Sequence, residues 1–451
     1  MFHRTADLAA DYLETLEERP VGSRASRDEV LRALGGSLPE RPEDPAAIVE
    51  ALHDAAARGT TATGSGRFFG FVVGGALPSA IAVDWLTSTW DQNAGLFVLG
   101  PTASVVEEVA GAWLCELFGL PVDASVAFVT GCQMAHVTCL AAARHDVLER
   151  AGWDVEQDGL AGAPPIRIVA GAKYHVTVEV ALRFLGMGRG ALRVVPADAG
   201  GRMVTDGLRD VLGEYDGPTI VCAQAGEVNT GAFDDLNAVA DAAADAGAWM
   251  HVDGAFGLWA AAGPATRHLV DGVERADSWA TDAHKWLNVP YDCGLAFTAH
   301  PQAHLAATSA HAEYLMKSDA GSERDESDWT PDFSRRARGY TVYAAIRALG
   351  RQGVVDLVER TCRHARELAE GIGGLAGCEV LNDVVLNQVL LRFADDETTD
   401  RVLAAVQDGG EAWPSGTTWD ERRAIRLSVS NWRTSDRDVA RTVEAFRKAI
   451  G

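Results

Sequence analysis

The chain of 451 residues contains only four lysines, and one of them has neighbours that suggest covalent chemistry. Lys285 follows a strand-like apolar run, residues 278–282, and comes directly after His284. An enzyme that uses pyridoxal phosphate needs one lysine to form an imine with the aldehyde of this cofactor. A lysine taken alone is most often a surface residue. Its neighbours nevertheless favour Lys285 as the imine lysine over Lys173, Lys317 and Lys448.

A carboxylate, Asp253, ends a second apolar run, residues 249–253, and leads into a turn of small residues. Pyridoxal phosphate needs a carboxylate against its ring nitrogen, because a protonated ring withdraws electrons from the substrate. The carboxyl end of a parallel strand is also where open α/β sheets bind ligands. Alone, Asp253 could equally be a helix N-cap. Its combination with the Lys285 segment favours the cofactor role, and the small Ala255 leaves room for a flat ring.

A turn and a histidine elsewhere in the sequence also fit this cofactor. Gly131, Cys132 and Gln133 connect a predicted strand to a long predicted helix, so their N–H groups and the helix dipole are available to a phosphate. A strand–glycine–helix turn is common and is weak evidence alone. His175 follows the predicted strand 166–170 and could stack on the cofactor ring, although a lone histidine is more often a cap or a core residue.

Composition excludes several classes of partner. The net charge of −24 disfavours binding to nucleic acid and to anionic membranes. Seven scattered cysteines without a C-x-x-C pair argue against a disulfide framework and against a metal site. The N-terminus has no signal-peptide pattern, and no stretch is long and apolar enough for a membrane span. We therefore expect a cytoplasmic protein that acts on a small molecule.

Apolar, β-rich runs alternate with alanine-rich helices from about residue 66 to 300, which predicts a mostly parallel sheet covered on both faces. We expect an N-terminal helical segment (1–65), a large domain (66–335) and a smaller C-terminal α/β domain (336–451). Segment 1–65 has no core of its own and should pack on a second subunit. Polar residues 316–333 predict a loop. The predicted strands of the large domain are 124–129, 166–170, 193–195, 219–223, 249–253, 278–282 and 294–298.

Together these segments resemble the group II pyridoxal-phosphate-dependent amino-acid decarboxylases, which include the aromatic amino-acid, glutamate and cysteine-sulfinate decarboxylases. The most specific part is Thr-Asp-Ala-His-Lys-Trp-Leu-Asn-Val-Pro-Tyr-Asp-Cys-Gly at 281–294. The resemblance runs from about residue 68 to 350 and more loosely to the end. It implies the aspartate aminotransferase-like fold (fold type I), with a three-layer α/β/α large domain. It also implies a homodimer with active sites at the subunit interface.

The resemblance assigns roles residue by residue. Lys285 would carry the internal aldimine, and His284 would lie near the phosphate and the substrate carboxylate. Asp253 would pair with the pyridinium, and His175 would stack on the ring. Contacts to the phosphate and the ring hydroxyl are implied for Gly131, Cys132, Gln133 and Asn229. Phe68, Phe71 and Val72, with Trp90, would line the substrate pocket; the phenylalanines hint at an apolar or aromatic substrate, although core packing explains them equally well.

One departure from the family affects the expected reaction. The family carries, on a loop after the lysine, a tyrosine that protonates the quinonoid carbon. Here no tyrosine lies between Tyr314 and Tyr340, and the loop offers Glu326, Ser327 and Trp329 instead. Loss of this donor should not stop the release of carbon dioxide, but it could divert the carbanion to oxygen or another electrophile. His175 or water could also supply the proton.

The leading hypothesis is decarboxylation of an L-amino acid through a Lys285 aldimine and a quinonoid intermediate. The same scaffold could instead support decarboxylation-coupled oxidative deamination, aldolase or lyase chemistry, or transamination. For transamination Arg426 could anchor a carboxylate, but a surface position is the favoured interpretation of Arg426. A non-catalytic binding protein is a further alternative. A nicotinamide-dependent oxidoreductase ranks last, because the glycines at 186–190 follow a predicted helix and precede a strand, the reverse of a dinucleotide-binding turn.

Overall fold

A seven-stranded sheet lies at the centre of the computed structural model, which describes residues 1–310 and 323–451. Its strand order is β1-β7-β6-β5-β4-β2-β3. Only β7 runs antiparallel to its neighbours, so the predicted mostly parallel sheet is confirmed. The strands are β1 (Ser125–Val129), β2 (Arg167–Gly171), β3 (Leu192–Val195), β4 (Thr219–Gln224), β5 (Trp249–Asp253), β6 (Ser278–Asp282) and β7 (Gly294–Thr298).

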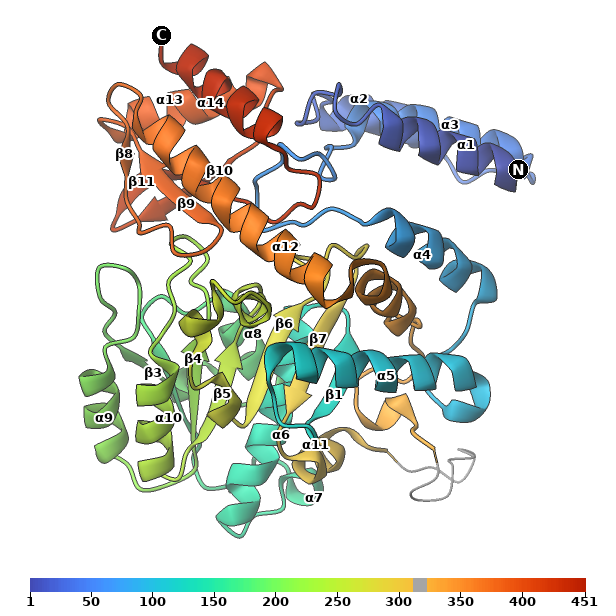
Figure 1. The fold of residues 1–451 in the computed structure, drawn as a ribbon. Coiled ribbons are helices and arrows are strands. Elements are labelled where there is room, and N and C mark those ends of the chain that lie inside the picture. The colour runs from blue at the N-terminus through green and yellow to red at the C-terminus, as the bar shows by residue number, and fades with distance from the viewer. Residues whose placement is uncertain (311–322) are drawn as a thin grey trace.

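Helices cover both faces of this sheet (Figure 1). Successive side chains of a strand point to opposite faces. In β2, Val169 packs in the core cluster that includes α5, α9 and α10, whereas Ile168 and Ala170 pack in the cluster that includes α6 and α8. The large domain is therefore a three-layer α/β/α sandwich. Its helices are α5 (Pro101–Phe118), α6 (Cys132–Arg150), α7 (Val155–Asp158), α8 (Val176–Phe184), α9 (Thr205–Gly213), α10 (Leu236–Asp245) and α11 (Pro301–Thr308).

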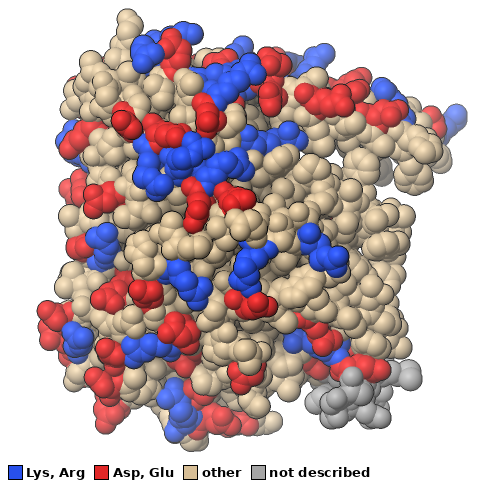
Figure 2. Space-filling view, viewed as in Figure 1, with Lys and Arg blue, Asp and Glu red and all other residues tan. Residues whose placement is uncertain are grey.

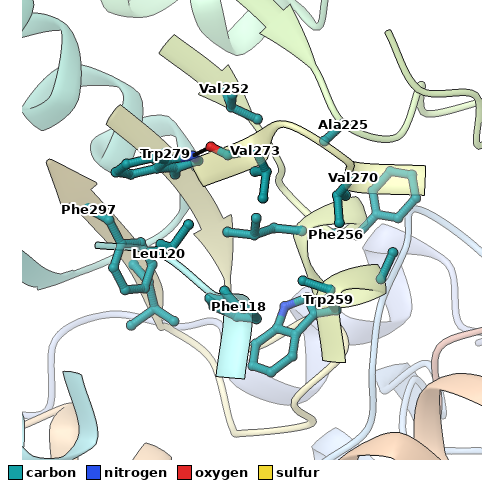
Figure 3. Close-up of a cluster of buried hydrophobic side chains, with 14 of the residues drawn as sticks. Phe118, Leu120, Ala225, Val252, Phe256, Trp259, Val270, Val273, Trp279 and Phe297 are labelled. Atoms are coloured by element: carbon teal, nitrogen blue, oxygen red, sulfur yellow. Dashed lines mark hydrogen bonds between the residues drawn. The ribbon is translucent and has the colours of Figure 1, made fainter. Parts of the chain in front are cut away.

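Aromatic side chains fill the layer between the sheet and α5 (Figure 3). Phe118 packs edge-to-face on Trp259, with ring centroids 4.9 Å apart, and on Phe297. The indole of Trp279 donates a hydrogen bond to the carbonyl oxygen of Val273 at 2.8 Å, so this fully buried ring leaves no polar group unsatisfied. This packing fixes β6, which ends at Asp282.

A second sheet, of four antiparallel strands in the order β10-β11-β9-β8, forms the smaller C-terminal unit. Helix α12 connects it to the large domain, where α12 packs against α5 (Figure 1). Gly350 interrupts α12 with φ 61° and ψ 178°, a conformation that suits glycine. The elements are α12 (Gly339–Gly373), β8 (Glu379–Val380), β9 (Gln388–Arg392), α13 (Asp396–Gly409), β10 (Ser415–Trp419), β11 (Arg422–Ser428) and α14 (Asp436–Ile450).

The N-terminal helices α1 (Phe2–Glu14), α2 (Arg27–Leu34) and α3 (Pro45–Gly59) lie side by side and extend away from the rest of the chain (Figure 1). They bury only Leu8 and Ala55. Helix α4 (Pro78–Trp90) follows.

The domain limits at residues 65 and 335 stay predictions. Of the predicted loop 316–333, residues 316–322 lie outside the described part of the chain. Within residues 1–310 and 323–451, no helix combines the length and the apolarity that a membrane crossing requires.

Candidate active site

The carboxyl ends of β5 and β6 and the first turn of α6 surround a cavity of about 340 Å³. This is the sheet edge at which open α/β folds bind ligands. Lys285, Asp253 and His175, which lie far apart in the sequence, line this one cavity. The remaining lining residues are Phe71, Val72, Gly131, Cys132, Gln133, Thr177, Gln224, Gly226, Val228, Ala255, Phe256, Asp282, His284 and Tyr291.

Lys285 is the only lysine that lines the cavity among the described residues. Its Nζ lies 2.9 Å from Oδ2 of Asp282, and the other carboxylate oxygen of Asp282 accepts the Cys132 N–H at 2.6 Å. Burial acts to lower the pKa of Lys285, but the Asp282 carboxylate outweighs it and the pKa is raised. Asp282 therefore connects Lys285 to the first turn of α6 and fixes the position of the amine.

Asp253 ends β5 and is buried beside two histidines. Its Oδ2 lies 3.5 Å from Nε2 of His136, and Nδ1 of His136 lies 2.9 Å from Nε2 of His251. Burial acts to raise the pKa of Asp253, but His136, His175 and the Ala255 N–H together hold it well below its usual range. Asp253 is therefore a carboxylate at neutral pH, as a partner for a cationic ring must be.

The imidazoles of His175 and His284 line the cavity. In each ring, a hydrogen bond shows that Nδ1 is an acceptor and carries no proton. Nδ1 of His175 accepts the N–H of Thr177, which makes His175 the N-cap of α8. Nδ1 of His284 accepts the N–H of Cys293 at 3.2 Å. Burial lowers the pKa of both histidines. Both rings are therefore neutral near pH 7, with the proton on Nε2.

Helix α6 begins at Cys132, at the wall of the cavity. The N–H groups of a first helical turn have no intrahelical acceptor, and the helix dipole adds positive potential there. The carboxylate of Asp282 already accepts the Cys132 N–H. Because Gln133 also lines the cavity, this end of α6 is suited to an anionic group such as a phosphate.

Three of the predicted positions do not line the cavity of their own chain. Phe68 stacks on Trp413, with ring centroids 5.1 Å apart, and Trp90 packs edge-to-face on Tyr340. Asn229 donates its side-chain amide to Glu227 and accepts the hydroxyl of Thr417.

The favoured surface position of Arg426 is wrong. This residue is 7% exposed, lies in the middle of the small sheet, and donates to the carbonyl oxygen of Val228 at 3.0 Å. Glu326 and Ser327 are buried away from the cavity lining, and Trp329 packs against His304.

Several residues of the site were missed from the sequence. Asp282 stood in the motif that carries Lys285, three residues before the lysine at the end of an apolar run, and this spacing was an available signal. Tyr291 stood in the same motif, seven residues after His284. His136 gave no such signal, because only the folded chain brings it to Asp253.

The donor set of the cavity fits pyridoxal phosphate. Lys285 offers an amine for the aldehyde, Asp253 offers an ionised carboxylate for the ring nitrogen, and the first turn of α6 offers N–H groups for the phosphate. Ala255 in the lining leaves space for a flat ring. The fold and this donor set define the chain as a pyridoxal-phosphate enzyme of fold type I.

Comparisons with known proteins identify the family. Residues 28–394 match the pyridoxal-dependent decarboxylase conserved domain. The chain is 26% identical to an aromatic-L-amino-acid decarboxylase of Bacillus atrophaeus, over 97% of the chain and 92% of the relative. It is 30% identical to an L-2,4-diaminobutyrate decarboxylase of Rhizobium meliloti (81% and 74%). A phenylacetaldehyde synthase of Petunia hybrida shares 25% identity (82% and 74%).

Comparison with solved structures supports the same family. The crystal structure of Oryza sativa TDC with PLP and tryptamine superposes with a TM-score of 0.93 at 25% identity, covering 100% of this chain and 96% of that one. The chain belongs to the pyridoxal-dependent decarboxylase family. It is a pyridoxal-phosphate-dependent carboxy-lyase that acts in amino-acid metabolism.

Proposed function

We propose that the protein removes the α-carboxylate of an L-amino acid as carbon dioxide and that Lys285 holds the cofactor covalently. The single observation that carries this proposal is the meeting of the Lys285 amine, the Asp253 carboxylate and the first turn of α6 in one cavity. These groups come from three separate elements, and each meets a different chemical demand of the same cofactor.

The bound cofactor supplies an electron-withdrawing ring that stabilises negative charge at the substrate carbon. The residues of the chain make this possible. Asp253, kept ionised by its neighbours, holds a proton on the ring nitrogen. The N–H groups at the start of α6 bind the phosphate, and His175 contacts the ring. Asp282 orients Lys285 before the cofactor arrives, and neutral His284 donates its Nε2–H to an anionic group of the cofactor or the substrate.

A substrate panel tests the proposal. The purified holoenzyme is mixed separately with L-tryptophan, L-tyrosine, L-phenylalanine, L-glutamate, L-2,4-diaminobutyrate and L-cysteine sulfinate. Carbon dioxide and organic products are then quantified by mass spectrometry. We expect carbon dioxide in equal amount to amine for at least one substrate, and none from the D-enantiomer. No carbon dioxide from any member, with cofactor bound at Lys285, would contradict the proposal.

A second candidate function is decarboxylation followed by oxidation to an aldehyde. The relative named phenylacetaldehyde synthase favours it, as does the absence of tyrosine from positions 315–339. The same panel separates the two functions, because this outcome consumes dioxygen and yields aldehyde, ammonia and hydrogen peroxide in place of amine.

We further propose a homodimer. The face formed by α4, α5 and the adjacent underside of the N-terminal helices carries few charged side chains (Figure 2). An apolar cavity of about 520 Å³ lies between α1, α3 and α4. Phe2, Trp85, Leu86 and Trp90 are between 44% and 82% exposed, which is typical of an interface in a chain of this size. Light scattering coupled to size exclusion should give twice the mass of one chain, and a monomer at micromolar concentration would contradict the proposal.

A further inference from the structure

Replacement of a carboxylate by hydrogen requires a proton donor at the substrate carbon. When carbon dioxide leaves, the electron pair of the broken carbon–carbon bond stays on that carbon and must take up a proton. The donor has to be protonated at neutral pH, free to reach the substrate, and able to recover a proton from water. These three requirements can be checked for each proton-bearing side chain around the cavity.

Most candidates around the cavity fail one of these requirements. Lys285 is paired with Asp282 and is needed to hold the cofactor. Cys132 is buried beside His136, and burial raises the pKa of its thiol well above the usual value. His175 and His284 have lowered pKa values and are neutral near pH 7. A neutral imidazole is a far weaker acid than a phenol, so neither ring is a good donor.

Tyr291 meets all three requirements. It lines the cavity together with Lys285 and His284, and its ring stacks on His284 with centroids 4.3 Å apart and an interplanar angle of 30°. Within residues 1–310 and 323–451, its hydroxyl has no hydrogen-bond partner, so it is free to turn toward a ligand. Partial burial and Asp282 raise the pKa of Tyr291, with Lys285 opposing, so the phenol keeps its proton. The residue is 61% exposed, which leaves it open to water.

We propose that Tyr291 is the catalytic acid that protonates the substrate carbon after carbon dioxide has left. This inference rests on the proposed decarboxylation. The O–H bond of Tyr291 breaks, a C–H bond forms at the substrate carbon, and the phenolate recovers a proton from water. His284 holds the ring of Tyr291 at the wall of the cavity. Without the hydroxyl, dioxygen takes two electrons from the carbon and becomes hydrogen peroxide, and water releases aldehyde and ammonia.

The test uses Tyr291→Phe, which removes the hydroxyl and keeps the stack on His284. In a single turnover of the holoenzyme with the best substrate of the panel, carbon dioxide release should stay within about threefold of wild type, whereas amine formation falls about a hundredfold. In air, aldehyde and hydrogen peroxide should replace the amine. Tyr343→Phe is the matched control, because Tyr343 stacks on Trp113 outside the cavity lining and should keep the wild-type ratio of amine to carbon dioxide.

A second readout does not depend on turnover. In protein freed of cofactor and labelled with ¹³C at the tyrosine ring, the resonance that is missing from Tyr291→Phe should shift when pyridoxal phosphate is added. Cofactor affinity of the variant should match wild type. An unmoved resonance, or an amine-to-carbon-dioxide ratio near one in Tyr291→Phe, would overturn the role of Tyr291. Equal loss of both products would also overturn it, because proton delivery follows bond cleavage. Failure of the wild type to release carbon dioxide would instead refute the proposed decarboxylation.

Discussion

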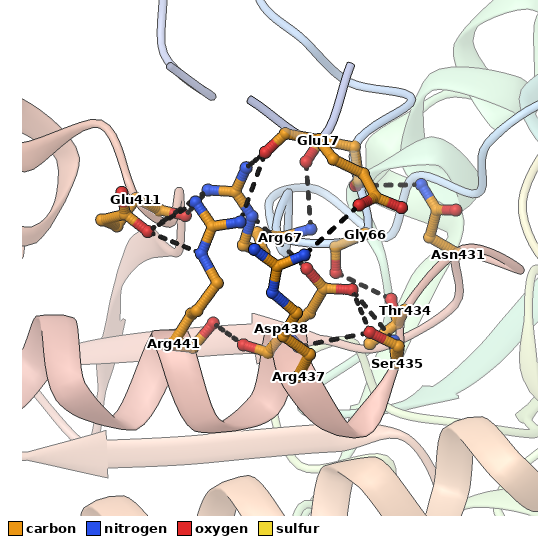
Figure 4. Close-up of polar contacts among 12 residues, drawn as sticks. Glu17, Gly66, Arg67, Glu411, Asn431, Thr434, Ser435, Arg437, Asp438 and Arg441 are labelled. Carbon is orange, nitrogen blue, oxygen red and sulfur yellow. Dashed lines mark hydrogen bonds and ion pairs between the residues drawn. The ribbon is translucent and has the colours of Figure 1, made fainter. Parts of the chain in front are cut away.

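Two cations in this chain, Arg67 and Lys285, have opposite surroundings. Arg67 is 1% exposed and faces protein groups on every side (Figure 4). Its guanidinium donates to the backbone carbonyl oxygens of Glu17, at 2.5 Å, and of Glu411, and its Nε lies 3.4 Å from Asp438. Lys285 has one carboxylate, Asp282, on one side and the cavity on the other.

The difference separates a structural cation from a chemical one. The partners of Arg67 belong to the connection after α1, the loop before β10 and helix α14 (Figure 4), so Arg67 ties the N-terminal segment to the small C-terminal unit. Arg67 does not line the cavity that Lys285 lines. Lys285 keeps an open side and uses Asp282 only for orientation. Removal of the first cation should therefore affect stability, and removal of the second should affect chemistry.

Lys285→Ala is expected to have the largest effect. The variant should lose turnover by more than about a thousandfold, because no other amine lines the cavity in the described chain. It should stay folded, since Asp282 keeps the Cys132 N–H. Carbon dioxide release measures turnover, and borohydride reduction followed by peptide mapping measures the covalent link. Lys173→Ala, which removes an amine paired with Asp420, is the control; a labelled peptide in Lys285→Ala would contradict the assignment.

Asp253→Asn should lower turnover about a hundredfold or more while it retains part of the cofactor. Asparagine is nearly isosteric but carries no charge to hold a proton on the ring nitrogen. His136 keeps an oxygen acceptor in this variant, so packing changes little. Cofactor titration and single-turnover carbon dioxide release separate the two effects. Wild-type turnover in the variant would show that the ring nitrogen does not depend on Asp253.

Much of the large domain was predictable because its strands are short, fully buried and end in polar or small residues. The bounds of β5, β6 and β7 match the predicted runs residue for residue. Strand β10, Ser-Gly-Thr-Thr-Trp, was missed because it is polar and contains glycine. Its sequence does not indicate a strand, and only its pairing with β11 in the structure defines it as one.

The site was less predictable, because side-chain contacts depend on residues that are distant in sequence. Trp90 was expected at the substrate but packs on Tyr340, 250 positions later, and Phe68 packs on Trp413. Arg426 was read as exposed because its charge is the only local signal, yet a backbone carbonyl in the other unit accepts its hydrogen bond. Local sequence defines position at strand ends, where Asp253 and Asp282 lie, whereas the contacts of Phe68 and Trp90 depend on distant parts of the chain.

Arg67→Met should act on stability. The substitution leaves the Asp438 carboxylate without its buried partner and should lower the free energy of unfolding by about 3 kcal/mol. Turnover per folded molecule should change little, because Arg67 does not line the cavity. Urea unfolding monitored by tryptophan fluorescence measures the change. Arg441→Met is the matched control: its pair with Glu411 is partly exposed and should contribute less than about 1 kcal/mol. Equal losses in the two variants would remove the distinction between an enclosed and an exposed arginine.

The smallest expected effect concerns His304, a buried group that carries no charge in the folded chain. Its Nδ1 accepts the Ser125 hydroxyl at 2.8 Å, and its Nε2–H donates to the carbonyl oxygen of Trp329 at 2.9 Å. Burial, helped by the charge of Arg324, lowers the pKa of His304 to about 3. The unfolded chain therefore takes up a proton near pH 6.5 that the folded chain refuses, so stability is present above pH 6.5 and is lost as the pH falls toward 3.

His304→Asn should remove this dependence. Between about pH 7.5 and 5.5, the free energy of unfolding of the wild type should fall by about 1 kcal/mol more than that of the variant. Urea unfolding at both pH values measures the difference, and a variant with an unchanged cavity should keep wild-type cofactor affinity. Parallel pH curves for the two proteins would mean that His304 is protonated in the folded chain. His304 would then be a buried cation like Arg67, and burial without a carboxylate partner would not be enough to keep an imidazole neutral.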